Sequence, residues 1–195
     1  SHGGAGSSPS QARWLVQSLG QNYFGAFLDR GGTLCQDGSD VDVNYLNAVS
    51  GKRVTVALDG SSDIDLGNGA ALRFLTAGAP DTTNTLYVRG RPNVDGGMSE
   101  NNKSVTCLVT YGGFDMYLGG DAEGTNEAQA ALVIGDLGRG VDVMLVDHHG
   151  SATNGISSPQ FLSSISPEAA LICIWPNAWQ LPNKATVSNL DAVDI

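Results

Sequence analysis

Short strand-like segments separated by glycine-containing turns fill the first half of the sequence and limit the folds that it can adopt. Three segments alternate between apolar and polar residues, with Asp-Gly and Gly-Asn-Gly turns between them, and they span residues 54–58, 62–66 and 70–76. Alternation of this kind with tight turns is typical of antiparallel strands, so the region predicts a β-meander. The following residues, 79–103, are polar and rich in Gly, Asn and Pro, which predicts a long surface loop.

From residue 104 onward, strand patterns and helix patterns alternate. The predicted elements are, in order, two strands around a Gly-Gly turn (104–121), a helix with Asn126 at its N-cap (124–138), a strand (141–151), a helix opened by Pro159 (158–166), a strand (168–176) and a C-terminal helix. This order predicts an α/β protein in which helices cover the outer faces of sheets. The 195 residues contain no repeat and no linker, so we expect a single domain spanning 1–195.

Charge and composition exclude some classes of partner. The chain has 20 acidic and 10 basic residues and a net charge of −10, which repels phosphate backbones and makes duplex nucleic acid an unfavourable partner. No apolar stretch approaches the roughly 20 residues that span a bilayer, so we expect no membrane span. Scarce lysine and abundant Ser, Asn, Gly and Thr suit a secreted or cell-envelope protein of bacteria.

Polar residues with metal-ligand chemistry directly follow two of the predicted strands. Asp121 ends the segment "FDMYLGGD", and His148 and His149 end "VDVMLVDHHGS". In layered α/β folds, residues just past the carboxyl ends of strands face the ligand cleft. A carboxylate with neutral imidazoles suits Zn²⁺, Mn²⁺ or Fe, and the neighbouring glycines leave room for an ion and a substrate. The alternative is that Asp121 caps a helix and both histidines lie in a solvated loop.

Three stretches in the same order resemble the C-terminal half of metallo-β-lactamase-fold hydrolases. They are "NNKSVTCLVTYGGFDMYLGGD", "VDVMLVDHHGSATN" and "SPEAALICIWPNAWQLP", within residues 23–190. The most similar branch contains the ComEC-like competence nuclease domains and exported phosphodiesterases. The resemblance implies an αββα sandwich, of which this chain supplies the C-terminal half or more. It also implies a metal-dependent hydrolase with two divalent ions, Zn or Mn.

The resemblance also assigns roles to individual residues. It implies that Asp121 bridges both ions and that one histidine of the pair binds metal, with His149 as the ligand and His148 as the group that contacts the scissile phosphate or its leaving oxygen. Asp147 either orients an imidazole or is solvated. The other residues that the resemblance singles out are Asn102 and Ser104 at the strand entry, with a structural role, and Ser151 and Asn177 as substrate contacts.

Two departures from the family pattern qualify this interpretation. The family's H-x-H-x-D-H cluster is absent, and "SHGG" at the start matches its last histidine and the glycines after it, which makes His2 a metal ligand or else a cloning remnant. The N-terminal portion of the fold would then be missing, and we expect a preceding segment of the same domain to complete it. Leu181 also stands where the family has a substrate-contacting histidine.

The resulting function hypothesis is hydrolysis of a phosphodiester by a metal-bound hydroxide, since two ions polarise phosphoryl oxygens and lower the pKa of a bridging water to about 7. The acidic surface favours a small-molecule or cell-envelope phosphodiester as substrate. The alternative hypothesis is a catalytically inactive member of the same fold that serves as a binding or structural domain. A β-lactamase-like or thioesterase-like reaction on the same fold is a third hypothesis.

Overall fold

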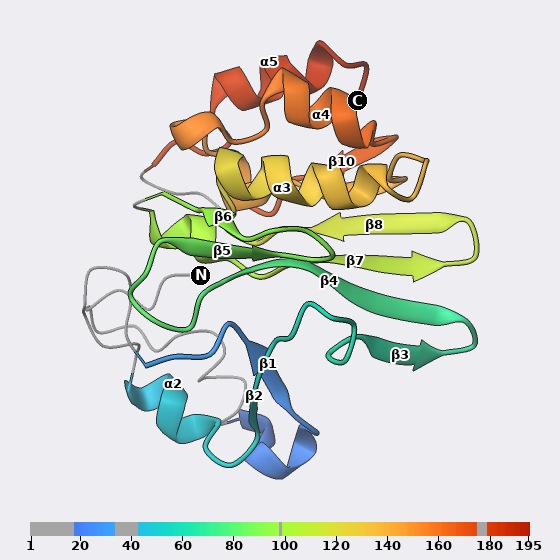
Figure 1. Cartoon of the computed structure of the whole chain (residues 1–195). Helices are drawn as coiled ribbons and strands as arrows, with labels where there is room; N and C mark the ends of the chain where they lie inside the picture. Colours follow the sequence, from blue (N-terminus) through green and yellow to red (C-terminus); the bar gives the residue numbers. More distant parts are fainter. Residues whose placement is uncertain (1–17, 34–42, 98, 175–178) are drawn as a thin grey trace.

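An eight-stranded mixed sheet forms the middle layer of the molecule (Figure 1). The computed structural model describes residues 18–33, 43–97, 99–174 and 179–195. The strands in spatial order are β10 (Ala169–Leu171), β9 (Val143–Leu145), β8 (Phe114–Leu118), β7 (Thr106–Tyr111), β4 (Ala70–Gly78), β5 (Thr85–Val88) and β6 (Val94–Asp95), and β3 (Ile64–Gly67) also pairs with β4. Strands β8, β9 and β10 run parallel to one another and the other pairs are antiparallel.

Three helices cover one face of this sheet. They are α3 (Gly124–Gly135), α4 (Pro159–Ile165) and α5 (Lys184–Asp191), stacked on the same side in Figure 1. Beneath them, alternate residues of β7 and β8, such as Leu108 and Tyr117, are buried with Ile134 and Leu162 of the helices. The period-2 pattern of the strands and the apolar stripes of the helices therefore meet in one core.

A smaller layer lies on the opposite side of the sheet. Strands β1 (Phe27–Asp29) and β2 (Arg53–Thr55) form a separate parallel pair, flanked by the 3-10 helix η1 (Gln21–Tyr23) and helix α2 (Val43–Ala48). Val56 packs with Phe74 and Ala77 of β4 in a second apolar cluster beneath the sheet. This layer covers the β4 region of that face.

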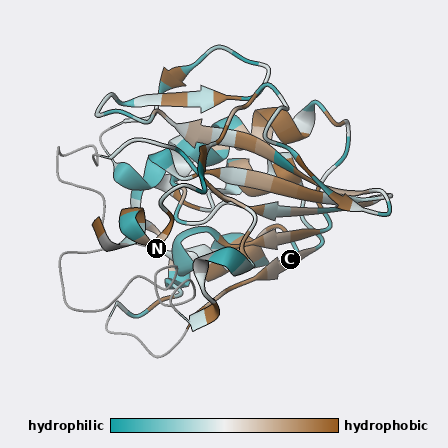
Figure 2. Ribbon diagram, turned by 90° about the horizontal axis from the view of Figure 1, so that it is seen from below, coloured by the Kyte–Doolittle hydropathy of each residue, from teal (hydrophilic) through white to brown (hydrophobic). Residues whose placement is uncertain are grey.

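The rest of that face is apolar and partly exposed to solvent. The residues of β7 to β10 that point away from the helices form cross-strand pairs. These pairs are Val109 with Met116, Met116 with Val143, Leu118 with Leu145, and Leu145 with Leu171. At the margins, Tyr111 is 58% exposed, Leu171 50% and Phe114 40%. Figure 2 views the molecule from this side and shows long hydrophobic stretches along the strands. We call this surface, made by β7, β8, β9 and β10 outside the cluster around Val56, the uncovered face, a name that refers to the described residues alone.

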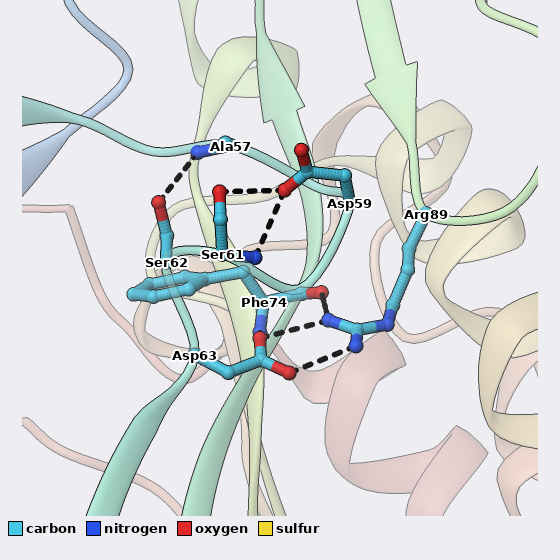
Figure 3. Close-up of polar contacts among 7 residues, drawn as sticks. All are labelled: Ala57, Asp59, Ser61, Ser62, Asp63, Phe74 and Arg89. Carbon is cyan, nitrogen blue, oxygen red and sulfur yellow. Dashed lines mark hydrogen bonds and ion pairs between the residues drawn. The ribbon is translucent and has the colours of Figure 1, made fainter.

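A bidentate ion pair joins the start of β3 to β5. Both guanidinium nitrogens of Arg89 lie 2.8 Å from the two carboxylate oxygens of Asp63, and Arg89 also donates to the Phe74 carbonyl at 3.1 Å (Figure 3). The same Asp63 carboxylate accepts from the Phe74 backbone N–H at 3.2 Å. These bonds hold the turn before β3 against the centre of the sheet.

Three predictions about local structure are wrong. The segment 54–58 is not the first strand of a meander. Its start belongs to β2, which pairs in parallel with β1, and the Val56 N–H continues this ladder to the Asp29 carbonyl. Arg53 also donates to the Asp29 side chain. Residues 79–103 contain β5, β6 and the 3-10 helix η2 (Glu100–Lys103) instead of forming a loop, since Leu86 and Val88 are buried in the core. The N-cap of α3 is Glu123, and Asn126 is buried inside the helix.

The length and hydropathy of the helices test the expectation that the chain has no membrane span. Among the described residues, no helix combines the length and the apolar character that crossing a membrane requires.

Candidate functional site

The predicted site residues gather where three parallel strands end. Leu118 of β8, Leu145 of β9 and Leu171 of β10 are aligned by the strand register. The chain after β8 leads to Asp121, the chain after β9 forms the 3-10 helix η3 (Asp147–Gly150), and the chain after β10 leads to Cys173. The backbone N–H of His148 donates to the Gly120 carbonyl at 2.8 Å, which ties the first two of these connections together.

Asp121 and His149 face each other across this edge of the sheet. The His149 Nε2 atom lies 3.8 Å from the Asp121 Oδ1 atom, and their side chains are 34% and 11% exposed. The Nδ1 atom of His149 lies 2.8 Å from the Cys173 carbonyl oxygen. Because a carbonyl oxygen only accepts hydrogen bonds, Nδ1 carries the proton, and the neutral ring therefore has its lone pair on Nε2.

This pair of atoms fits a divalent cation in part. A lone pair on Nε2 and a carboxylate oxygen are both electron donors, and two ligands about 2.1 Å from one ion in tetrahedral geometry lie about 3.4 Å apart. The observed 3.8 Å separation is near that value. Within residues 18–33, 43–97, 99–174 and 179–195, no group of three or more His, Cys, Asp or Glu side chains is placed to hold a metal ion. The described chain thus supplies two ligands of the several that an ion needs.

The backbone that carries the histidines adopts an uncommon conformation. His148 and His149 have φ values of 46° and 58°, and Gly150 follows with 77°, so three consecutive residues are left-handed. Each non-glycine residue in this region costs roughly 1 kcal/mol, and such strain persists where the surroundings impose it. Pro182 packs behind the turn, because a Cβ atom on Gly150 would lie 2.7 Å from the Pro182 Cβ.

A pair of buried carboxyl groups lies beneath this turn. Asp147 is completely buried, and the Tyr117 hydroxyl donates to its Oδ2 atom at 3.0 Å. Burial raises the pKa of Asp147 well above its usual value, and the Glu127 carboxyl beside it raises that pKa further. Burial also raises the pKa of Glu127, whose two oxygens accept the Ser157 N–H. Both alternatives for Asp147 are therefore wrong: its carboxyl group is buried, and it accepts a hydrogen bond from the Tyr117 hydroxyl and not from an imidazole.

Amide side chains fill the other side of the site around a buried glutamate. The Glu123 side chain accepts hydrogen bonds from Asn101 at 3.0 Å, Asn154 at 2.9 Å and Asn102 at 3.5 Å. The Nδ2 atom of Asn101 also lies 3.4 Å from Nδ1 of His148. Glu123 is 2% exposed, so this carboxylate is held almost entirely by donors of the protein.

The remaining predicted residues have structural contacts or lie outside the description. Asn102 accepts the Asn126 N–H at 3.2 Å, and the Ser104 carbonyl accepts the Asn126 side chain at 2.9 Å, so both join η2 to α3. Ser151 is buried, and its hydroxyl bonds Thr153 at 3.0 Å. His2 and Asn177 lie outside the described residues. A separate groove of about 750 Å³, between the segments 56–59 and 87–93, shares no residue with this site.

Sequence reasoning missed Asn101, Glu123, Glu127 and Tyr117. Glu123 stands two residues after Asp121 and opens α3, and Asn101 precedes the predicted Asn102 in the run "ENNK". The position of Glu123 soon after β8 was the available signal. The contact between η2 and the start of α3, which brings Asn101 to His148, was not visible in the sequence.

The comparisons with known proteins find a partial relative, and no family model matches the chain. The chain is 35% identical over 94 residues to Recombination protein 2 of Haemophilus influenzae. The match covers 47% of this chain and 11% of that protein, so the chain spans a small part of the length of its relative. The chain is therefore a mixed α/β protein with a distant, partial similarity to a recombination protein.

Proposed function

We propose that this chain contributes the metal-binding edge of a phosphodiester hydrolase. The observation that carries the proposal is the 3.8 Å approach of His149 Nε2 to Asp121 Oδ1, with His148 beside them on a strained turn. Two acceptor atoms held face to face at a strand edge repel each other unless a cation or a proton lies between them. The strain at both histidines supports the same proposal, because such conformations cluster at functional sites.

Each residue of the candidate site would have its own role in this proposal. His149 and Asp121 would hold the cation, and the Cys173 carbonyl would orient the His149 ring through Nδ1. His148 would contact the phosphoryl group. Divalent ions bound at such a site supply positive charge to phosphoryl oxygens and lower the pKa of water. We also propose that His2 and residues of a preceding segment supply the further ligands.

The uncovered face supports the finer proposal about the fold. Apolar residues of β7 to β10 face away from the helices, and a sheet with one apolar face exposed gains stability when a second layer covers it. We propose that a second sheet packs on this face, which makes the complete domain an αββα sandwich of the metallo-β-lactamase type. The segment that supplies it would belong to the same protein.

The substrate proposal is a phosphodiester of small-molecule or cell-envelope type, on a secreted or envelope-associated bacterial protein. The net charge of −10 disfavours a long polyanion as substrate. The name of the partial relative refers to recombination, and this makes single-stranded and duplex DNA necessary comparison substrates.

The test measures bound metal and hydrolysis in the full-length protein. Metal content would be determined by plasma mass spectrometry, and activity with bis(p-nitrophenyl) phosphate, in the wild type and in Asp121→Ala, His149→Ala and His148→Gln. We expect about two equivalents of Zn or Mn in the wild type. Asp121→Ala and His149→Ala should lose at least one equivalent and most activity, whereas His148→Gln should keep the metal and lose activity.

Unchanged metal content and unchanged hydrolysis in Asp121→Ala and His149→Ala would contradict the proposal. A folded wild-type protein without metal and without hydrolysis would favour the second candidate, a catalytically inactive binding or structural domain. The observation that favours this candidate is Leu181, which stands where the resemblance expects a substrate-contacting histidine.

A further inference from the structure

The two adjacent histidines differ in the partner of their Nδ1 atom. His149 Nδ1 lies 2.8 Å from the Cys173 carbonyl oxygen, whereas His148 Nδ1 lies 3.4 Å from the side-chain nitrogen of Asn101. We infer that the two neutral rings carry their protons on opposite nitrogens, and that Asn101, oriented by Glu123, is the positioning residue that sets the His148 tautomer. The inference deepens the proposed function, on which its catalytic part rests.

The orientation of the Asn101 amide follows from Glu123. The Glu123 Oε1 atom lies 3.0 Å from Asn101 Nδ2, and a carboxylate oxygen only accepts hydrogen bonds, so the amide must present its NH₂ group on this side. Asn154 donates to the other oxygen of Glu123 at 2.9 Å, which agrees with a carboxylate that only accepts. The amide of Asn101 therefore cannot turn its carbonyl oxygen toward His148 without losing its bond to Glu123.

The His148 tautomer follows from that orientation. One hydrogen of the Asn101 NH₂ group is directed to Glu123, and the second is available to His148 Nδ1 at 3.4 Å. The Nδ1 atom must then accept, which leaves the proton of the neutral ring on Nε2. His149 has the reverse arrangement, with a proton on Nδ1 and a lone pair on Nε2.

Opposite tautomers give the two rings different chemistry at one site. His149 has the form that binds a cation through Nε2. His148 has the form that donates a hydrogen bond through Nε2 to a phosphoryl oxygen on which negative charge develops. A neutral imidazole that gave up this proton would become an imidazolate, so His148 acts as a hydrogen-bond donor and does not protonate the leaving oxygen.

The test reads both tautomers directly by NMR. Histidine tautomers give distinct patterns in long-range ¹H–¹⁵N correlation spectra, and substitution of one histidine at a time identifies its signals whatever other histidines the full-length protein contains. Labelled full-length protein would be measured at pH 7.5, with and without added Zn²⁺, and the signals assigned with His148→Gln and His149→Gln. We expect the Nε2–H pattern for His148 and the Nδ1–H pattern for His149.

Two variants separate positioning from general stability. In Asn101→Asp, one carboxyl oxygen faces Glu123 and must share a proton with it, since two carboxylates cannot both be ionised at this distance. The other oxygen is an acceptor facing His148, so the His148 ring should move its proton to Nδ1, and kcat for bis(p-nitrophenyl) phosphate should fall at least tenfold with little change in KM. Asn154→Gly removes another donor to Glu123 without touching His148, and because Asn154 has a φ of 52°, glycine fits there without strain. This control should keep the His148 pattern.

An Nδ1–H pattern, or a doubly protonated ring, at His148 of the wild type would overturn the inference. So would the Nε2–H pattern persisting in a folded Asn101→Asp protein. The spectra do not depend on turnover. Opposite tautomers in a protein without hydrolysis would therefore leave the inference standing and remove the proposed function.

Discussion

Gly119 leaves the space that the Asp147 carboxylate occupies. A Cβ atom on residue 119 would overlap with Oδ1 of Asp147 and with the Tyr117 hydroxyl. The glycine is needed for its lack of a side chain, since its φ is not in the left-handed region. The strand end before Asp121 therefore packs closely against the turn that carries the histidines, and this contact requires that residue 119 has no side chain.

Gly119→Ala should therefore destabilise the fold. The added methyl must displace a buried carboxyl group, and overpacking of this kind costs about 1–3 kcal/mol. Urea unfolding followed by circular dichroism would measure the loss. Gly113→Ala in the β7–β8 turn is the control, because a Cβ atom there meets nothing within 4 Å. Equal stability of the two variants would contradict the packing described above.

Glu127→Gln should make the stability less dependent on pH. Burial raises the pKa of Glu127 to about 7 in the folded chain, so between the unfolded value near 4.5 and that pKa the folded state holds a proton that the unfolded state releases. The contribution of protonated Glu127 to the unfolding free energy is fully present below the unfolded pKa. It is lost as pH rises through the folded pKa. A glutamine side chain does not titrate, so the decline of the unfolding free energy between about pH 4.5 and pH 7 should become shallower in the variant.

Unfolding curves at several pH values would measure this slope. Glu168→Gln, at an exposed position before β10, serves as the control and should leave the slope as it is in the wild type. A Glu127→Gln slope identical to that of the wild type would refute the assignment of the titration to this buried pair.

Arg89→Lys should cost about 1 kcal/mol, since lysine cannot reproduce the two parallel bonds to Asp63 or the bond to the Phe74 carbonyl. The Arg91–Asp136 pair offers a matched comparison, because Asp136 is 63% exposed and exposed pairs contribute little. Thermal unfolding of Arg89→Lys and Arg91→Lys would show which pair contributes more. A larger loss from Arg91→Lys would be the contrary result.

Leu171→Lys tests whether another layer covers the uncovered face. Leu171 and Leu132 are 50% and 47% exposed, but Leu171 lies on β10 and Leu132 on α3. If a second sheet packs on β10 in the full-length protein, Leu171→Lys should lower its stability by about 2 kcal/mol or more, because a charge would then be buried. Leu132→Lys should change it by less than about 0.5 kcal/mol. Similar small effects of both substitutions would argue against a covering layer.

The sequence predicted elements with strong local signals and missed those fixed by distant contacts. The hairpin of β7 and β8, the start of α4 at Pro159, and strands β9 and β10 follow from local patterns. The parallel pairing of β1 with β2 does not, because it depends on a bond between Arg53 and Asp29, 24 residues apart. Strand β5 escaped detection because its four residues lie inside a polar run rich in Gly, Asn and Pro, a composition that predicts a loop.

The candidate site divides in the same way. The place of Asp121 and of the His148–His149 pair after strands predicts a shared site, and the resemblance singles out His149 as the ligand. The structure brings Asp121 and His149 within 3.8 Å. The part played by Asn101 and Glu123 depends on the contact between η2 and the start of α3, which no local pattern encodes. Side chains that orient other side chains are hard to recognise in a single sequence, because Asn and Glu are common residue types.

The uncovered face and the site edge lie on different parts of the same sheet. The first is a surface of the strands, and the second is the row of loops at their carboxyl ends. Leu118, Leu145 and Leu171 belong to that surface and are also the last residues of their strands, directly before the loops. Pressure on these three leucines from the strand side would therefore reach the loops, so the surface and the edge are mechanically coupled.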